Sequence, residues 1–98
     1  MLKLWLDDIR HVPDSSYVHV HSVNEAISII KQYEDMGETD FLLDCDHDLG
    51  EYAYDGGDGI KLLDWLAETG RHYKVVLHTM NIVGRQNMER LINRYSLG

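Results

Sequence analysis

The fold is decided by the stretch Phe41-Leu42-Leu43-Asp44-Cys45-Asp46-His47-Asp48-Leu49-Gly50. It opens as a short apolar run, typical of a buried strand, and changes within a few residues into carboxylate and imidazole groups. Two other apolar runs, at residues 2–6 and 75–77, end in the same way, with Asp7-Asp8 and His78-Thr79. In an open α/β sheet, ligands bind beyond the carboxyl ends of the strands. The sequence therefore predicts one site built from three strand ends.

Composition restricts the class of protein. The 98 residues, 44% of them hydrophobic, are enough for one folded domain spanning 1–98. The single cysteine, Cys45, rules out an intrachain disulfide and favours a reducing compartment. The sequence shows no signal peptide and no run near the ~20 apolar residues of a membrane span, so we expect a cytoplasmic protein.

Charge restricts the partners. With 9 Lys and Arg against 17 Asp and Glu, the net charge is −8, which argues against binding to duplex DNA or to an anionic membrane. A small phosphorylated ligand is compatible with this charge, because a bound divalent cation reverses the sign locally. The sequence leaves any protein partner unknown.

Periodicity predicts the element order strand, strand, helix, strand, helix, strand, helix. We expect strands at residues 2–6, 17–21, 40–46 and 73–79, and a loop at 50–59. A capping-box pattern from Ser22 to Glu25 starts the first helix, which ends at Met36-Gly37. The second helix runs from Ile60 to near Gly70. The third helix carries an apolar stripe made of Met88, Leu91, Ile92 and Tyr95.

Helices between the later strands imply crossover connections, and these favour a parallel sheet. Right-handed crossovers place such helices on the faces of the sheet. We therefore predict a small three-layer α/β fold, with a partly open two-layer sandwich as the alternative.

The acidic strand ends suggest a cation. Adjacent carboxylates such as Asp7 and Asp8 repel each other unless they are separated, protonated or bridged by a cation. Asp46 supplies a third carboxylate, and hard cations such as Mg²⁺ or Mn²⁺ prefer oxygen ligands. The alternative is a solvated loop in which one aspartate caps a helix. We predict Asp7, Asp8 and Asp46 as metal ligands, and leave Asp44 without a role.

Two histidines at the strand ends are candidates for proton transfer. His47 is flanked by carboxylates that can orient its ring, although it could also be a ligand or a structural spacer. His78 begins the segment before the third helix, and exposed N–H groups at a helix start favour phosphate. Asn81 and Arg85 could complete a phosphate pocket. Alternatively, Asn81 only caps the helix and Arg85 is a solvated surface residue.

Three segments of the chain, residues 4–10, 46–50 and 78–88, resemble the cyclic-phosphate processing receiver-like domain, a divergent relative of response-regulator receivers. The resemblance covers nearly the whole chain and implies a receiver-like (flavodoxin-like) fold with strand order 2-1-3-4. Asp7-Asp8 match the receiver acidic pair, Asp46 the phosphoacceptor, and Thr79 the switch position. The sequence departs from receivers in having no helix between the first two strands and no fifth strand with its lysine.

The resemblance implies activity on cyclic phosphates, either 2′,3′-cyclic nucleotides or RNA ends. Together with the acidic strand ends and the histidines, it leads us to predict a metal-dependent phosphoesterase. Its catalytic groups would be His47 and His78. The phosphate or substrate would be held by Arg10, Asp48, Thr79, Asn81 and Arg85. The alternative is a non-enzymatic receiver-like signalling or interaction module with an acidic site for a divalent cation and phosphate.

Overall fold

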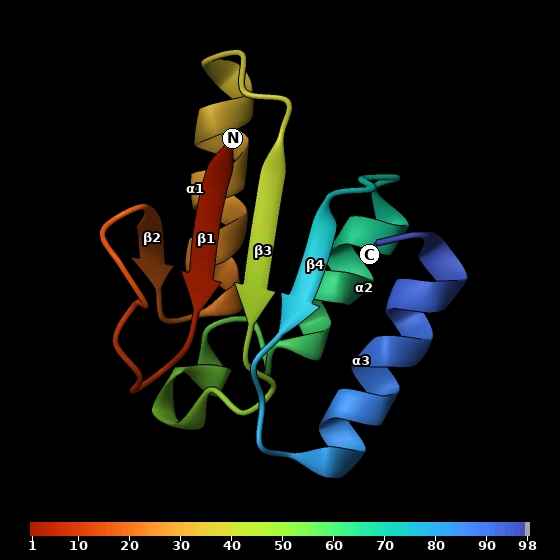
Figure 1. Cartoon of the computed structure of the whole chain (residues 1–98). Coiled ribbons are helices and arrows are strands. Elements are labelled where there is room, and N and C mark those ends of the chain that lie inside the picture. The colour runs from red at the N-terminus through yellow and green to blue at the C-terminus, as the bar shows by residue number, and fades with distance from the viewer. Residues whose placement is uncertain (98) are drawn as a thin grey trace.

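A computed structural model of the protein describes residues 1–97, and Figure 1 shows its elements. Their order is β1 (Leu2–Leu6), β2 (Tyr17–Val20), α1 (Val23–Asp35), β3 (Phe41–Cys45), a short 3₁₀ helix η1 (Gly50–Tyr54), α2 (Ile60–Glu68), β4 (Lys74–Leu77) and α3 (Ile82–Tyr95). The predicted order is confirmed. Strands β2, β3 and β4 are shorter than predicted, and the loop predicted at 50–59 contains η1.

The four strands form one parallel sheet in the order β2-β1-β3-β4. The central strand β1 pairs with β2 from Lys3–Tyr17 to Leu6–Val20, and with β3 from Leu2–Phe41 to Leu6–Cys45. All strands therefore end at the same edge of the sheet. The predicted parallel sheet, its strand order and the receiver-like fold are confirmed.

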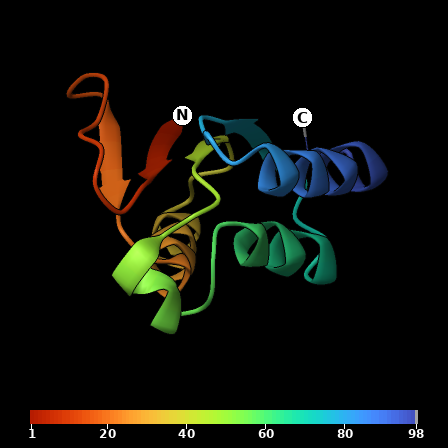
Figure 2. The same cartoon turned by 90° about the horizontal axis from the view of Figure 1, so that it is seen from below.

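The helices lie mainly on one side of this sheet. Connections β2-α1-β3 and β3-α2-β4 advance in the same direction across the sheet, so right-handed crossovers place α1 and α2 on the same face. Figure 2, seen from below, shows α1 and α2 on one side of the sheet and α3 flanking the β4 edge, where it packs against α2. The β1–β2 connection runs the other way and contains no helix. Within residues 1–97 the fold is thus the partly open two-layer form, and the predicted third layer is missing.

Strand alternation divides the side chains between the two faces. Leu4, Leu6 and Leu43 are fully buried and point toward the helices, and burying each leucine contributes roughly 1.5–3 kcal/mol. Trp5 lies on the opposite face but is only 7% exposed. The β1–β2 loop covers it, and the Trp5 indole donates a hydrogen bond to the Arg10 carbonyl at 3.2 Å. This loop partly substitutes for the missing helix.

The first helix begins as its sequence predicts. The Ser22 hydroxyl accepts a hydrogen bond from the Glu25 backbone N–H at 3.1 Å, and the Glu25 carboxylate accepts one from the His21 N–H at 2.6 Å. The Ser22 bond satisfies a donor that a helix start leaves unpaired, whereas the Glu25 bond reaches one residue further back than in a standard capping box. In the described part of the chain, no helix has the length and apolar character needed to cross a membrane.

Candidate functional site

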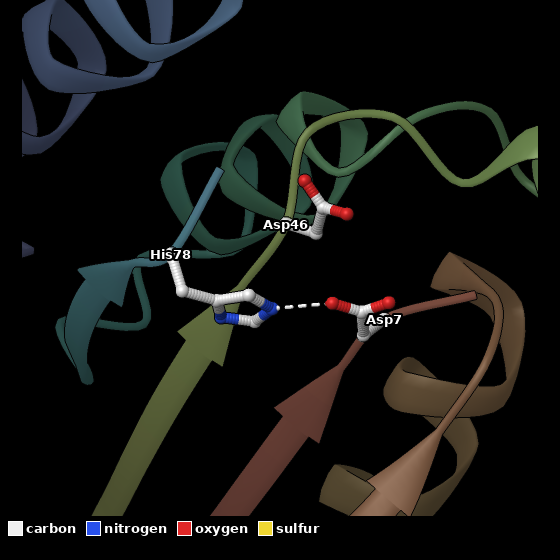
Figure 3. Close-up of side chains that lie close together, drawn as sticks. All are labelled: Asp7, Asp46 and His78. Carbon is white, nitrogen blue, oxygen red and sulfur yellow. Dashed lines mark hydrogen bonds and ion pairs between the residues drawn. The ribbon is translucent and has the colours of Figure 1, made fainter. Parts of the chain in front are cut away.

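His78 is held between two carboxylates at the carboxyl edge of the sheet. Its Nε2 lies 2.8 Å from Asp7 Oδ2, and its Nδ1 lies 2.7 Å from Asp44 Oδ1 (Figure 3 shows the Asp7 contact). The ring also stacks on the Trp5 indole, with centroids 3.7 Å apart. Burial disfavours the imidazolium, but the hydrogen bonds to Asp44 and Asp7 outweigh it and raise the pKa of His78. Because ionised carboxylates only accept, the two contacts favour the imidazolium form, in which both ring nitrogens donate.

Asp7 connects His78 to the loop that follows β1. Its Oδ1 accepts hydrogen bonds from the backbone N–H groups of Ile9 at 2.9 Å and Arg10 at 2.8 Å. Burial would raise the pKa of Asp7, but the backbone bonds, together with His78, lower it. The side chain is 1% exposed. Asp7 is therefore a buried, ionised residue whose two oxygens already have partners.

Asp8 and Asp46 complete the acidic cluster. Burial, reinforced by the charges of Asp7 and Asp46, raises the pKa of Asp8. The Asp8 carboxylate also lies against Gly50, where an added Cβ would come within 2.6 Å of Oδ2. Gly50 has φ +54°, so glycine suits this position for two reasons. A bound cation would relieve the repulsion among these three crowded carboxylates.

The donor set fits a divalent cation. Asp7, Asp46 and His78 each offer a ligand atom within 4.8 Å of the others (Figure 3). His78 Nε2 is already used by Asp7, so the carboxylates are the better ligands, and an oxygen-rich set suits Mg²⁺ or Mn²⁺. A second group of acid and imidazole side chains consists of His47, Asp48 and Asp58.

His47 is oriented by a chain of hydrogen bonds that reaches α3. Its Nδ1 lies 2.9 Å from Asp48 Oδ1, and the Asn81 amide donates to both Asp48 oxygens at 3.1 Å. The Asn81 Oδ1 in turn accepts from the Gly84 N–H at 2.8 Å, which caps α3. The His47 ring lies so close to Gly84 that a Cβ there would come within 2.5 Å of Cγ. Asn81 is thus both a helix cap and a link to the site.

The remaining predicted site residues differ in whether they contact the site. The Arg10 guanidinium donates to the His78 carbonyl at 3.1 Å. Thr79 is 7% exposed, and its hydroxyl accepts from the Asn81 N–H at 3.1 Å. The Arg85 guanidinium instead donates to Glu89 at 3.0 Å in an exposed i,i+4 pair. Among residues 1–97, no recorded polar contact joins Arg85 to the acidic cluster.

Two residues of the site were not predicted. Asp44, which had no assigned role, is a partner of His78, and Trp5 supports the same ring. One signal was available: Asp44 is a charge inside a central strand, where a partner is needed. Trp5 and Asp44 are also cross-strand neighbours in register. The glycines that accommodate the site, Gly50, Gly59 and Gly84, gave no such signal; at Gly59 a Cβ would overlap the Asp46 carbonyl.

A parallel sheet in the order β2-β1-β3-β4 with an acidic pair after β1 and an aspartate after β3 defines a receiver-type domain. The family model of the cyclic-phosphate processing receiver domain matches residues 2–94. The chain belongs to this family, as the sequence motifs predicted. Searches of curated proteins and of solved structures found no match.

Proposed function

We propose that this domain is a metal-dependent phosphoesterase acting on cyclic phosphates, such as 2′,3′-cyclic nucleotides or RNA ends. The main support is the cluster of Asp7, Asp8 and Asp46 at one sheet edge, next to two histidines that are each oriented by carboxylates. Membership of a family named for cyclic-phosphate processing supports the substrate class.

Asp8 and Asp46, with Asp7 beside them, would hold Mg²⁺ or Mn²⁺. When bound, such a cation polarises a phosphoryl oxygen or lowers the pKa of a bound water. The protein's own contribution is to place carboxylates where repulsion in the free state favours cation binding.

His47 is the proposed general base. The hydrogen bond to His47, with help from the Asn81 amide, lowers the pKa of Asp48, which burial alone would raise. An ionised Asp48 accepts from Nδ1–H, so Nε2 of the same ring is the proton acceptor. His78 is the proposed general acid, because both of its nitrogens carry protons. Arg10, Thr79, Asn81 and Arg85 are the proposed phosphate contacts, with Arg85 first releasing Glu89.

Hydrolysis of a nucleoside 2′,3′-cyclic phosphate, measured with Mg²⁺, with Mn²⁺ and with EDTA, tests this proposal. We expect turnover that requires the metal, and a loss of roughly 10²–10⁴ in rate for His47→Ala or His78→Ala. Asp46→Asn, which removes a proposed metal ligand, should abolish the metal-dependent turnover. Asp64→Asn, which alters only an exposed carboxylate paired with Lys61 on α2, is the matched control. Full turnover in both histidine variants would contradict the assignment.

A non-enzymatic receiver-like module is the alternative. Two observations favour it. Arg85, a proposed phosphate ligand, is already paired with Glu89, and the acidic cluster matches that of a receiver. In its specific form Asp46 accepts a phosphoryl group. Treatment with acetyl phosphate and Mg²⁺, followed by intact-mass measurement, separates the two functions. A mass gain that is lost in Asp46→Asn supports the module, and no gain in the wild type counts against its specific form.

A further inference from the structure

An open hollow of about 350 Å³ lies beside the acidic cluster. It is lined by Asp8 and Ile9 from the β1–β2 loop and by Gly50, Glu51 and Tyr52 from η1. Figure 1 shows η1 below the carboxyl ends of β1 and β2. The volume falls in the range of small-molecule sites, about 300–1,000 Å³. One wall, Asp8, belongs to the proposed metal site, whereas the other four residues have no role in the proposed chemistry.

Apart from Asp8, the lining combines apolar surface with one carboxylate acceptor. Ile9 is 79% exposed and Tyr52 is 37% exposed, although both are large hydrophobic side chains. Binding pockets typically present apolar and aromatic side chains with a few polar groups that fix orientation. Here the polar group is the Glu51 carboxylate, which accepts hydrogen bonds when ionised. Such a wall suits a flat, apolar ring with N–H groups on its edge.

The Tyr52 ring is braced by two other rings. Its centroid lies 5.1 Å from that of His21, and the His21 ring stacks on His19 at 4.3 Å. His19 Nε2 lies 3.0 Å from the carbonyl of Asp7. This row of rings connects Tyr52 to the backbone of the acidic site. An aromatic side chain held in place loses little conformational entropy when a ligand stacks on it.

We infer that this hollow is a nucleobase subsite, and that the substrates are nucleoside or RNA-terminal cyclic phosphates with an unpaired base. The inference rests on the proposed function for the position of the phosphate near Asp8. The base would stack on Tyr52, contact Ile9 and donate to Glu51. Guanine, which offers neighbouring N1–H and N2–H donors, suits a carboxylate acceptor best.

Kinetics with two substrates test the subsite. Guanosine 2′,3′-cyclic phosphate carries the base, whereas glycerol 1,2-cyclic phosphate has the same five-membered cyclic ester without one. We expect the wild type to have the lower KM for the guanosine ester. Stacking on one aromatic side chain is worth roughly tenfold in affinity. The KM for the glycerol ester divided by the KM for the guanosine ester should therefore fall about tenfold in Tyr52→Ala. Tyr54→Ala is the matched control, because Tyr54 lies on η1 outside the hollow and is 85% exposed.

A binding measurement separates failure of the subsite from failure of the enzyme. Calorimetric titration with guanosine 3′-monophosphate, in the presence of Mn²⁺, needs no turnover. If the nucleotide binds more tightly to the wild type and to Tyr54→Ala than to Tyr52→Ala, the subsite is supported, even when neither cyclic ester is hydrolysed. The absence of hydrolysis would overturn only the proposed function. Equal affinity of the three proteins, or no binding to the wild type, overturns the subsite. An unchanged KM ratio in Tyr52→Ala does the same.

Discussion

The imidazolium of His78 makes a pH-dependent contribution to the free energy of unfolding. Its pKa is raised in the folded protein, against opposing burial, by the Asp44 and Asp7 carboxylates. A raised pKa stabilises the fold fully below the ordinary value of 6.5, and this stabilisation is lost as pH rises through the higher folded value. Both partners are needed for the full shift, because each supplies one hydrogen bond.

Asp44→Asn should lower the pKa of His78, because it removes one of the two charges that favour the imidazolium. NMR titration of the His78 ring protons measures the shift directly. Asp48→Asn is the control, since Asp48 contacts His47, whereas the carboxylates bonded to His78 are those of Asp44 and Asp7. If the His78 midpoint were equal in the wild type and Asp44→Asn, the proposed origin of the shift would be wrong.

Gly84→Ala should destabilise the protein, although alanine normally stabilises a helix interior by up to about 1 kcal/mol. The added Cβ would come within 2.5 Å of the His47 ring, and overpacking of this kind costs roughly 1–3 kcal/mol. Urea unfolding measures the free-energy change, and the His47 resonances report displacement of the ring. Val83→Ala, at a 67% exposed position of α3, controls for the helix itself. A more stable Gly84→Ala protein with unmoved His47 resonances would rule out the clash.

At the scale of elements, one polar cluster ties α1 to the end of the sheet that is remote from the site. Glu34 on α1 receives two hydrogen bonds from the Arg71 guanidinium, both 2.9 Å, and one from the Tyr73 hydroxyl. The hydrogen bonds from Arg71, reinforced by Tyr73 against partial burial, lower the pKa of Glu34. Burial and the Glu34 contact raise the pKa of Tyr73 to about 12. A partly buried ion pair thus joins α1 to the connection that leads from α2 into β4.

Acid should weaken this link in a predictable direction. Because the pKa of Glu34 is lowered, its stabilisation is complete above the ordinary value of 4.5 and is lost as pH falls through the folded value. Glu34→Gln should cost about 1 kcal/mol at neutral pH, with a smaller cost under acidic conditions. Unfolding free energies measured between pH 7 and pH 3 test this. Glu89→Gln, which breaks only the exposed pair with Arg85, should have little effect at any pH.

Elements were easier to predict than contacts between them. Strand runs such as residues 2–6 carry their own signal in apolar composition, and the Ser22–Glu25 cap is local in sequence. The pairing of Asp44 with His78 joins residues 34 apart, and no periodicity encodes it. The one-sided packing of α1 and α2 follows from crossover direction, which needs the strand order first. The i,i+4 pair of Arg85 with Glu89 was visible in the sequence and pointed to a surface position for Arg85.

At the scale of the whole molecule, excess negative charge is concentrated where the strands end. The net charge of −8 works against the compact state, and three carboxylates of one cluster intensify this locally. Asp8 carries a raised pKa, so its ionised form is less favourable in the folded protein than in the unfolded chain. The crowded carboxylates therefore reduce the stability of the folded protein, a cost that the proposed function would explain.

Asp8→Asn should consequently raise the melting temperature of the metal-free protein while weakening its response to metal. A cation that binds only the folded state at a hundred times its Kd adds about 2.7 kcal/mol. We expect Mg²⁺ or Mn²⁺ to raise the melting temperature of the wild type more than that of Asp8→Asn. Thermal unfolding with EDTA and with each metal measures both effects. Equal metal responses in the two proteins would count against Asp8 as a ligand.

The stacking of Trp5 on His78 gives the protein an internal optical reporter. A protonated imidazole in contact with an indole quenches it by accepting an electron from the excited state, so we expect the fluorescence of Trp5 to depend on the charge and position of His78. The other tryptophan, Trp65 on α2, lies under the guanidinium of Arg71 and would add its own emission. With Trp65→Phe, a single emission band would follow proton loss and ligand entry at the acidic edge in real time, without any added dye.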